Sequence, residues 1–478
     1  MMLDDLFPYS EYKDSGLPYF GLIPTHWKVL RNGQIFSQRN QTGFPDLPIL
    51  EVSLKTGVRV RDFDNSKRKQ IMSDRGKYKR AAKGDIAYNM MRMWQGAVGV
   101  APVDGLISPA YVVASPFSGV DSRYYSYLFR TQSYMNEVNK YSHGIVADRN
   151  RLYWDEFKQM PSLFPPSDEQ KKIADFLDAH GRKVSRLVRI KRRQIELLKE
   201  LKQSVINDAI SRGVNTNIQL KPSGIDGLGE IPEHWELVMC KRILTLLTDY
   251  TANGSFGDLA KNVTYLDAGY ARAIRLTDLR TNLFNPGVYV SEHAYNYLKK
   301  SKLFGGEFLI ANVGAHAGYA CIMPKVSYPA TLAPNMMMAK FRQDRILIDF
   351  IVEAVNCNYV QAQLKIKANK SAAQPKINKD DFKQVILAIP SLEEQIQILN
   401  YIALKTEKLN RSIVSIENEI SLIIEFRSRL IADAVTGRKH IGEIVIGESL
   451  SEDSDLDITN DDALIDNEDV ADLEECEV

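Results

Sequence analysis

Basic residues are concentrated in one short stretch of this 478-residue chain, between positions 61 and 80. Arginine and lysine neutralise phosphates and contact guanine in the major groove of DNA, while asparagine and glutamine contact adenine. Asn65 and Gln70 are interleaved with the basic residues. The pattern favours a DNA-binding surface over the simpler alternative of a solvated basic face. Its candidate residues are Arg61, Lys67, Arg68, Lys69, Arg75, Lys77, Tyr78, Lys79 and Arg80.

Further candidate DNA contacts are scattered along the chain. In the first half we select Arg92 and Gln95, which follow the basic stretch. In the second half the same residue types occur in looser groups, so the prediction there is weaker and an ordinary charged surface is an equal alternative. The candidates are Arg272, Arg275, Asn312, His316, Lys367, Lys370, Gln374 and Lys376.

Sequence motifs for catalysis are missing. The chain has no G-x-x-x-x-G-K-[ST] loop for nucleotide phosphates and no histidine, cysteine or carboxylate cluster with metal-ligand spacing. We therefore expect no catalytic residue, no metal and no cofactor on this chain. The four cysteines lie far apart and no run of about 18 apolar residues occurs, which favours a reducing cytoplasm and no membrane span.

The overall charge of +1 hides an asymmetry. Residues 443–478 contain 15 acidic and no basic residues, which leaves 61 basic against 45 acidic residues in 1–442. A basic body indicates a polyanionic partner. The acidic segment has the composition of a solvated, disordered tail, with a regulatory role as the alternative.

The chain contains an internal duplication. Residues Lys13–Trp27 recur as Lys221–Trp235, with eight of fifteen positions identical at an offset of 208. Further on, Asp155–Gln159 match Asp380–Gln384 at an offset of 225, and this offset then stays constant to the end of the repeat. Each copy therefore has a globular part of variable length followed by a part of fixed length.

The fixed-length parts read as two long helices. The first begins after Pro166 and the second after Pro390, and each ends before a glycine, although Gly181 interrupts the first pattern. About 45 residues give a length of roughly 65–70 Å at 1.5 Å per residue. Narrow apolar seams at 3/4 spacing predict that the helices pair with each other, the alternative being that each packs on its own globular part. The predicted seam residues are Val184, Leu187, Leu198, Leu201, Val205, Leu409, Ile413, Ile416, Ile420 and Ile423.

The predicted architecture is an α+β fold with two duplicated mixed α/β domains, separated by two long helices that form an antiparallel coiled coil with pseudo-two-fold symmetry. A dimeric reader binds two half-sites at a distance set by its symmetry. One chain with two unlike domains predicts a bipartite, asymmetric target whose gap is set by the coil.

This organisation resembles the DNA specificity subunit of type I restriction–modification systems. The resemblance covers most of 13–440 and depends on the doubled K-x-S-G…I-P-x-H-W entry, the P-S-x-E-E-Q helix start and the L-I-x-D-A-V-T-G close at Leu430–Gly437. It implies target-recognition domains at 1–165 and 214–389, spacer helices at 166–213 and 390–440, and an acidic tail at 441–478.

The resemblance also implies partners and cofactors. The subunit would bind double-stranded DNA and two modification subunits, which use S-adenosylmethionine to methylate adenine. Restriction subunits would use ATP and Mg to cleave DNA. In that family the specificity subunit itself is not catalytic and binds none of these cofactors.

Two alternatives remain open from the sequence. One is a stand-alone bivalent DNA-binding protein without a methyltransferase partner. The other is a non-catalytic coiled-coil adaptor that binds proteins only.

Overall fold

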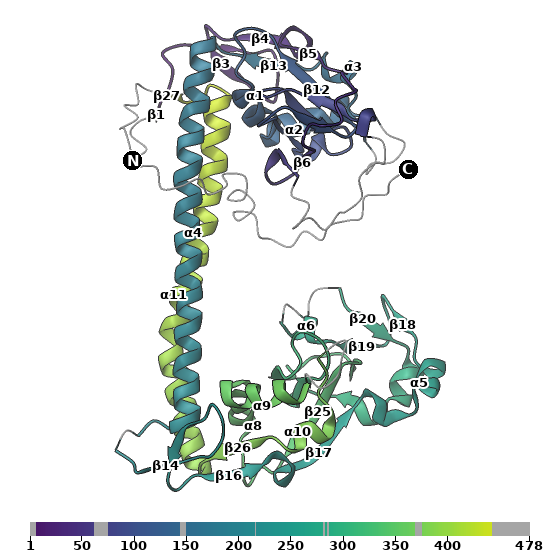
Figure 1. The fold of residues 1–478 in the computed structure, drawn as a ribbon, viewed down its shortest axis with the longest axis vertical. Helices are drawn as coiled ribbons and strands as arrows, with labels where there is room; N and C mark the ends of the chain where they lie inside the picture. The colour runs from purple at the N-terminus through teal and green to yellow at the C-terminus, as the bar shows by residue number, and fades with distance from the viewer. Residues whose placement is uncertain are drawn as a thin grey trace. The chain divides into compact units, whose positions relative to one another are not determined.

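The computed structural model describes residues 6–61, 75–143, 150–215, 217–280, 283, 286–368 and 375–441. The chain divides into two compact units (Figure 1): unit 1 is Met1–Gln194 with Ser415–Val478, and unit 2 is Ile195–Val414. Both units mix strands and helices, which confirms the predicted α+β class. Five DNA-contact candidates and the acidic tail from 442 onward lie outside the described residues; the five are Lys67, Arg68, Lys69, Lys370 and Gln374.

Each unit is built on an antiparallel four-stranded sheet. The strand order is β10-β9-β12-β5 in unit 1 and β23-β22-β25-β17 in unit 2, so the duplication read from the sequence holds at the level of topology. The strands of unit 1 are β5 (Phe36–Gln38), β9 (Ile86–Asn89), β10 (Val98–Val100) and β12 (Tyr111–Pro116). Those of unit 2 are β17 (Leu244–Asp249), β22 (Phe308–Ala311), β23 (Ala320–Ile322) and β25 (Met336–Phe341).

Short helices pack on these sheets and bury aromatic residues between them. Trp27, Phe36 and Tyr124 lie in the core of unit 1, while Trp235 and Phe308 lie in the core of unit 2, all with at most 1% of their surface exposed. The helices of unit 1 are α1 (Ser122–Phe129), α2 (Gln132–Tyr141) and α3 (Trp154–Phe157), and those of unit 2 include α8 (Ile348–Asn356), α9 (Asn358–Ala368) and α10 (Lys379–Lys383).

Smaller sheets join each domain to its long helix. In unit 1, β2 (Tyr12–Asp14) pairs with β3 (Leu22–Pro24), and β4 (Lys28–Arg31) pairs with β13 (Pro161–Phe164). The equivalent pairs in unit 2 are β14 (Leu220–Pro222) with β15 (Glu230–Pro232), and β16 (Glu236–Met239) with β26 (Ile386–Ile389). The repeated entry motif thus forms the same hairpin twice.

The most variable region of the repeat forms different additions in the two units. Unit 1 adds the strand pairs β6 (Leu50–Ser53) with β7 (Gly57–Val60) and β8 (Lys79–Ala81) with β11 (Gly105–Ile107). Unit 2 adds a five-stranded sheet in the order β18-β20-β19-β24-β21. Its strands are β18 (Tyr265–Leu266), β19 (Ala271–Ile274), β20 (Val288–Val290), β21 (Lys302–Leu303) and β24 (Ala330–Leu332). The two copies are therefore related but unlike.

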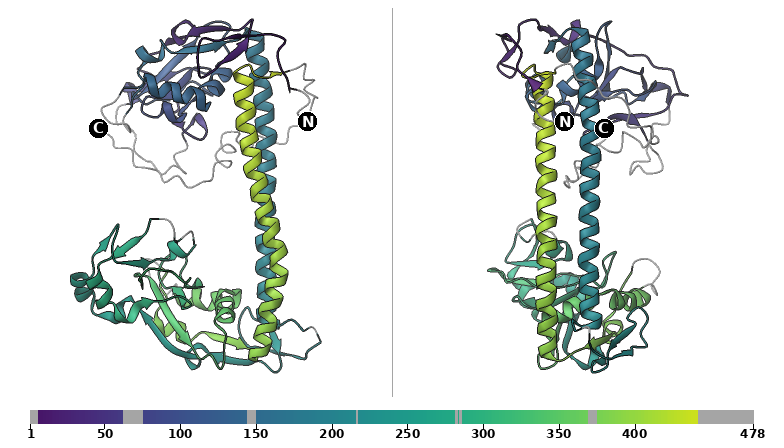
Figure 2. Two further views of the ribbon diagram at one scale, coloured as in Figure 1. Left: turned by 180° about the vertical axis from the view of Figure 1, so that it is seen from behind. Right: turned by 90° about the vertical axis from the view of Figure 1, so that its left-hand side faces the viewer.

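Two long helices, α4 (Ser167–Arg212) and α11 (Leu392–Val435), each contribute to both units. In unit 1, His180 of α4 lies against Phe426 of α11, and further along Lys191 pairs with Glu419. As the residue number rises along α4, the number of the contacting residue in α11 falls. The two helices are therefore antiparallel, as Figure 2 also shows. In unit 2, Lys202 Nζ donates to Asn410 Oδ1 at 2.9 Å.

The first long helix differs from expectation at Gly181, because α4 continues through this residue without a break. A glycine inside a helix costs only about 1 kcal/mol relative to alanine, which packing along the helix offsets. Among the described residues, no helix combines the length and hydropathy that crossing a membrane requires.

The seam of α4 also differs from the prediction at every second position. Val184 and Val188 are buried, whereas Leu187 and Leu201 are 42% and 51% exposed. The buried positions run from Val184 to Val188, four residues later, and then to Ile195, a further three plus four residues along. Leu187 and Leu201 lie outside this seam, so the prediction was wrong for these two residues. The partly buried Leu198 and Val205 fit the seam, and in α11 Leu409, Ile413, Ile416, Ile420 and Ile423 are buried or half-buried as predicted.

Candidate nucleic-acid interface

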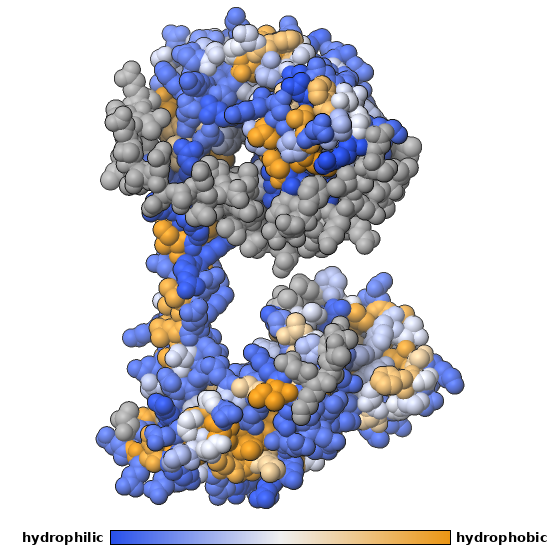
Figure 3. All heavy atoms as spheres, in the orientation of Figure 1, coloured by the Kyte–Doolittle hydropathy of each residue, from blue (hydrophilic) through white to orange (hydrophobic). Residues whose placement is uncertain are grey.

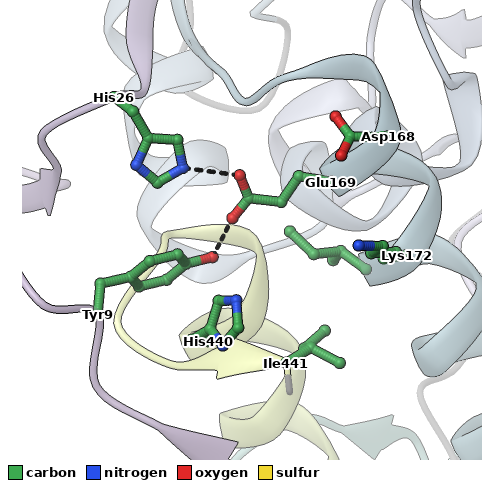
Figure 4. Close-up of a pocket in the computed structure, with 8 residues that line it drawn as sticks. Tyr9, His26, Asp168, Glu169, Lys172, His440 and Ile441 are labelled. Atoms are coloured by element: carbon green, nitrogen blue, oxygen red, sulfur yellow. Dashed lines mark hydrogen bonds and ion pairs between the residues drawn. The ribbon is translucent and has the colours of Figure 1, made fainter. Parts of the chain in front are cut away.

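The repeated His-Trp and Glu-Gln motifs hold each long helix to its domain. In unit 1, His26 Nε2 lies 2.8 Å from Glu169 Oε2, and the Tyr9 hydroxyl donates to the other carboxylate oxygen (Figure 4). In unit 2, His234 Nε2 lies 2.8 Å from Glu394 Oε2. Each histidine therefore holds the first turn of its long helix against the domain, which is a structural role.

The glutamine of the same motif fixes the chain that enters the helix. Gln170 Nε2 donates to the Pro165 carbonyl at 2.9 Å, and its Oε1 accepts from the Asp121 N–H at 3.0 Å. Gln395 repeats the first bond with Pro390 at 3.0 Å. Both glutamines are fully buried, so the helix start is tied to the domain in each copy.

One hairpin loop recurs in both units and carries predicted contact residues. It connects β9 to β10 in unit 1 (90–97) and β22 to β23 in unit 2 (312–319). The Leu152 N–H donates to the Met90 carbonyl at 2.9 Å, and the Ile377 N–H donates to the Asn312 carbonyl at 2.8 Å. Each loop has a glycine with positive φ one residue before its end, Gly96 and Gly318, a conformation that other residues rarely adopt. We call these the hairpin loops of units 1 and 2.

The hairpin loop of unit 1 contains Arg92 and Gln95, as the sequence suggested. Arg92 precedes a short 3-10 turn, Met93–Gln95, and the Gln95 side chain is exposed. Lys79 lies close by, because its Nζ donates to the carbonyl of Tyr111, which is paired with the last residue of β9. Burial lowers the pKa of Lys79. Arg92 and Gln95 are therefore placed together, on a loop held by the central sheet.

The other described basic residues between positions 61 and 80 lie on or beside the smaller strand pairs of unit 1. Arg75 and Lys77 are exposed on a short turn before β8. Arg80 forms an ion pair with Asp104 at 2.6 Å. Arg61 follows β7 and donates its backbone N–H to Ile49 at 2.8 Å. Exposure keeps Arg75 and Lys77 as candidate phosphate contacts.

Tyr78 is a correction to the predicted set. Its side chain is only 7% exposed and packs with Ile49 and Leu106 in a small core under the strand pairs. A buried ring cannot reach a base or a phosphate. Tyr78 lies just before β8, and its burial in this small core, rather than its neighbours' charge, determines its role.

In unit 2 the fold brings three predicted residues together. Asn312 and His316 belong to the hairpin loop, and a β-bridge joins Val313 to Lys376. Arg280 hydrogen-bonds His316 and is exposed, so it joins this group. The remaining described candidate on α9, Lys367, instead donates to Gln384 Oε1 at 3.1 Å.

Arg272 is a second correction. It is 2% exposed, its guanidinium donates to Asp278 at 3.0 Å and to the Leu283 carbonyl, and it lies inside the five-stranded sheet region. Arg275 is partly exposed but also binds Asp278, at 3.1 Å. We therefore remove Arg272 from the DNA-contact set, because a buried, paired arginine has no surface to offer.

Replacing Asp278 with asparagine is expected to destabilise unit 2 by about 3–5 kcal/mol, because the buried Arg272 charge loses its partner. Burial raises the pKa of Asp278, but hydrogen bonds from Arg275 and Arg272 outweigh it and hold the pKa below its usual range. This contribution is therefore present above the unfolded pKa of about 4 and is lost as pH falls below it. Urea unfolding at pH 7 and pH 3 measures both effects; an equal loss at both pH values would contradict this account.

Arg280 and Arg151 were missed as site residues. Arg151 occupies in unit 1 the place that Lys376 occupies in unit 2, 225 residues later, and both are exposed. The constant offset of the repeat is the sequence signal that connects them. No comparable signal marks Arg280, because it lies in the part of the repeat that differs between copies.

Comparisons with known proteins bear on what these two units do. Residues 232–421 match the family model described as type I restriction modification DNA specificity domain. Over 396 residues the chain is 23% identical to the putative type I restriction enzyme MjaX specificity subunit of Methanocaldococcus jannaschii, covering 78% of this chain and 85% of that one. It is 24% identical to the MjaVIII specificity subunit of the same organism over 249 residues, covering 50% and 53% of the two chains.

Solved structures share the fold. A chain from a structure of a type I restriction–modification system superposes with a TM-score of 0.60 at 13% identity, covering 86% of this chain and 98% of that one. Residues 232–421 are thus similar to a type I restriction modification DNA specificity domain, and the chain has the fold of that solved structure. The predicted resemblance is confirmed, because most of the chain is similar to a type I restriction enzyme specificity subunit.

Proposed function

We propose that this chain reads a bipartite, asymmetric DNA sequence for a type I restriction–modification complex, one half-site through each unit. The observation that carries the proposal is the recurrence of one hairpin loop on equivalent sheets, with different polar residues in each copy. Unit 1 presents Arg92 and Gln95, and unit 2 presents Asn312 and His316. Glutamine and asparagine both contact adenine, but only the unit 1 loop adds an arginine, which contacts guanine, so the two half-sites would differ.

The gap between the half-sites is proposed to depend on the long helices. Both α4 and α11 contribute residues to each unit, so the two domains are joined by two antiparallel helices rather than by a flexible linker. The number of base pairs between the half-sites would be fixed, but their bases would not be contacted. A target with a fixed number of unspecified base pairs follows from this arrangement.

The chemistry is proposed to belong to partner subunits. Two modification subunits would use S-adenosylmethionine to methylate an adenine in each half-site, after flipping the base from the stack. Restriction subunits would use ATP and Mg to cleave unmodified DNA. This chain would select the sequence and hold the partners, without a catalytic residue of its own.

The test is selection of DNA by the assembled complex. The chain is purified with its modification subunits and incubated with a random duplex library, and the bound DNA is sequenced. The proposal predicts enrichment of one two-part motif with a constant gap. Binding with no enriched motif would overturn it, as would a single uninterrupted motif.

The two alternatives give different results. A stand-alone DNA-binding protein would select the same motif without modification subunits and would not associate with them. An adaptor would bind those subunits but show no affinity for duplex DNA that weakens with salt.

Partner docking gives a further prediction. Leu187 and Ile190 lie about one turn apart on α4 and are 42% and 48% exposed, and Figure 3 shows apolar residues along the flank of the long helices. Burying each residue against a modification subunit is worth about 1.5–3 kcal/mol. Replacing both with glutamate is expected to weaken that association at least about tenfold.

Analytical ultracentrifugation or interferometry with purified modification subunit measures the association. The unfolding midpoint of the variant should stay within a degree or two of that of the unmodified chain, since both side chains lie on the surface. Unchanged partner affinity would remove this face from the proposed docking surface.

A further inference from the structure

A row of arginines follows one face of α4 in unit 1. Arg182, Arg186 and Arg189 are spaced by four and three residues, so their side chains lie above one another on the helix. All three are exposed. Within the described part of the chain, none of them has an ion-pair or hydrogen-bond partner, in contrast to Lys191, which pairs with Glu419 across the seam. We call these three residues the arginine row.

The direction of this face is set by the preceding turns of α4. Asp175 and Asp178 lie on it, and each accepts a hydrogen bond from Arg123 of α1 at 2.8 Å. The Tyr127 hydroxyl of α1 also donates to Asp178, at 2.7 Å. The spacing from Asp175 through Asp178 to Arg182 stays at three and four residues. The arginine row therefore continues the face that carries the recognition domain of unit 1, beyond the last contact with α1.

The other faces of the helix are already in use. Val184 and Val188 form the seam with α11 and are buried. Leu187 and Ile190 form the exposed apolar face on another side. The arginine row is distinct from both, because a step of 100° per residue places it about half a turn from the seam. The three positive charges therefore lie on the face that carries the recognition domain, and they form no ion pair with any residue that the structure describes.

Building on the function proposed above, we propose that the arginine row binds the phosphate backbone of the duplex next to the half-site read by unit 1, on the side of the unspecified base pairs. The row spans seven residues, or about 10 Å along the helix, which matches about three base pairs of rise. Guanidinium groups bind phosphate oxygens in a bidentate manner. Phosphate contacts position a protein without reading sequence, as a segment of unspecified base pairs requires.

The test compares a triple variant with the unmodified chain in the complete complex with modification subunits. Arg182→Gln, Arg186→Gln and Arg189→Gln are combined, and dissociation constants are measured from 50 to about 300 mM salt. One duplex carries the selected motif and one carries a scrambled sequence. The expected result is weaker binding of both duplexes, with the salt slope reduced by about 2.7, or 0.9 for each of three phosphates.

The ratio of affinities for the two duplexes is expected to stay unchanged, because the row reads no base. A matched control removes three exposed charges from the other long helix, by Lys405→Gln, Lys408→Gln and Arg411→Gln. The control should change the slope by less than 1. An unchanged slope in the triple variant would overturn the proposal, as would a loss confined to the motif duplex.

Two other occupants of the row have distinct outcomes. If the acidic residues 443–478 rather than DNA occupy it, a chain ending at Ile441 and the triple variant both keep the DNA affinity and the salt slope of the unmodified chain, which overturns the proposal. If an acidic surface of a modification subunit occupies it, the variant loses that subunit with an unchanged DNA slope, which also overturns it. Failure of the unmodified complex to prefer the motif duplex would count against the proposed function, whereas the slope for scrambled DNA tests the row independently.

Discussion

Alanine at both Arg92 and Gln95 is expected to abolish discrimination in one half of the target and leave the other half intact. Both residues lie on the hairpin loop of unit 1, and the Gln95 side chain is exposed. A good bidentate side-chain–base pair contributes about 1–3 kcal/mol of discrimination, so two such contacts give roughly a thirtyfold or greater loss. Competition binding with duplexes altered in one half at a time measures the effect.

The matched variant changes the hairpin loop of unit 2 and the segment bridged to it, with alanine at His316 and Lys376. These residues are exposed, and a β-bridge joins the Lys376 segment to the loop. This variant should relax the other half of the target and leave the first half unchanged. The unfolding midpoint of both variants should match that of the unmodified chain. Relaxation of the same half by both variants would contradict the assignment of one half-site to each unit.

Aspartate at Val188 is expected to lower the free energy of unfolding of unit 1 by about 3–5 kcal/mol. Val188 is 1% exposed and lies in the seam between α4 and α11. An unpaired carboxylate there must be buried without a partner or must force the helices apart, and both are costly. Thermal and urea unfolding followed by circular dichroism measures the loss.

The adjacent residue supplies the control. Leu187 is the same kind of side chain one position earlier in α4, but it is 42% exposed. Leu187→Asp is expected to change the free energy of unfolding by less than about 0.5 kcal/mol. Equal destabilisation by the two variants would mean that the register of the helix pair described here is wrong.

The sequence did not determine whether Leu187 or Val188 lies in the seam with α11. The apolar positions of α4 fit two registers that share Val184, Leu198 and Val205, one through Leu187 and one through Val188. Spacing alone does not distinguish the two registers. Packing against α11 does, because the face of α11 that carries Ile413 and Ile420 contacts only one of the two faces of α4. In α11 the apolar positions fit one register, and there the prediction was correct.

The duplicated fold was predictable because the repeat preserves the residues that build it. His26 and His234 occupy the same place in the repeated entry motif, and each contacts the glutamate at the start of a long helix. The five-stranded sheet of unit 2 was not predictable in the same way. It lies in the part of the repeat where the offset changes, so the first copy gives no guide to it.

The candidate site was predicted less well, because charge along a sequence does not show which side chains are buried. Tyr78 and Arg272 both sat among basic residues, yet each is inside a core. Tyr78 lies just before β8, and Arg272 lies in β19, whose four residues are all buried. Arg92 and Asn312, in contrast, are partly exposed in loops that follow a buried strand.

Mapping methylated adenines in the genome of a cell that carries this chain with its modification subunits tests the central claim most directly. The account predicts one motif with two unlike specified parts, a constant number of unspecified base pairs between them, and one methylated adenine in each part on opposite strands. Exchange of the unit 2 hairpin loop should change one part only. A single continuous motif, or a gap that varies from site to site, would contradict the account.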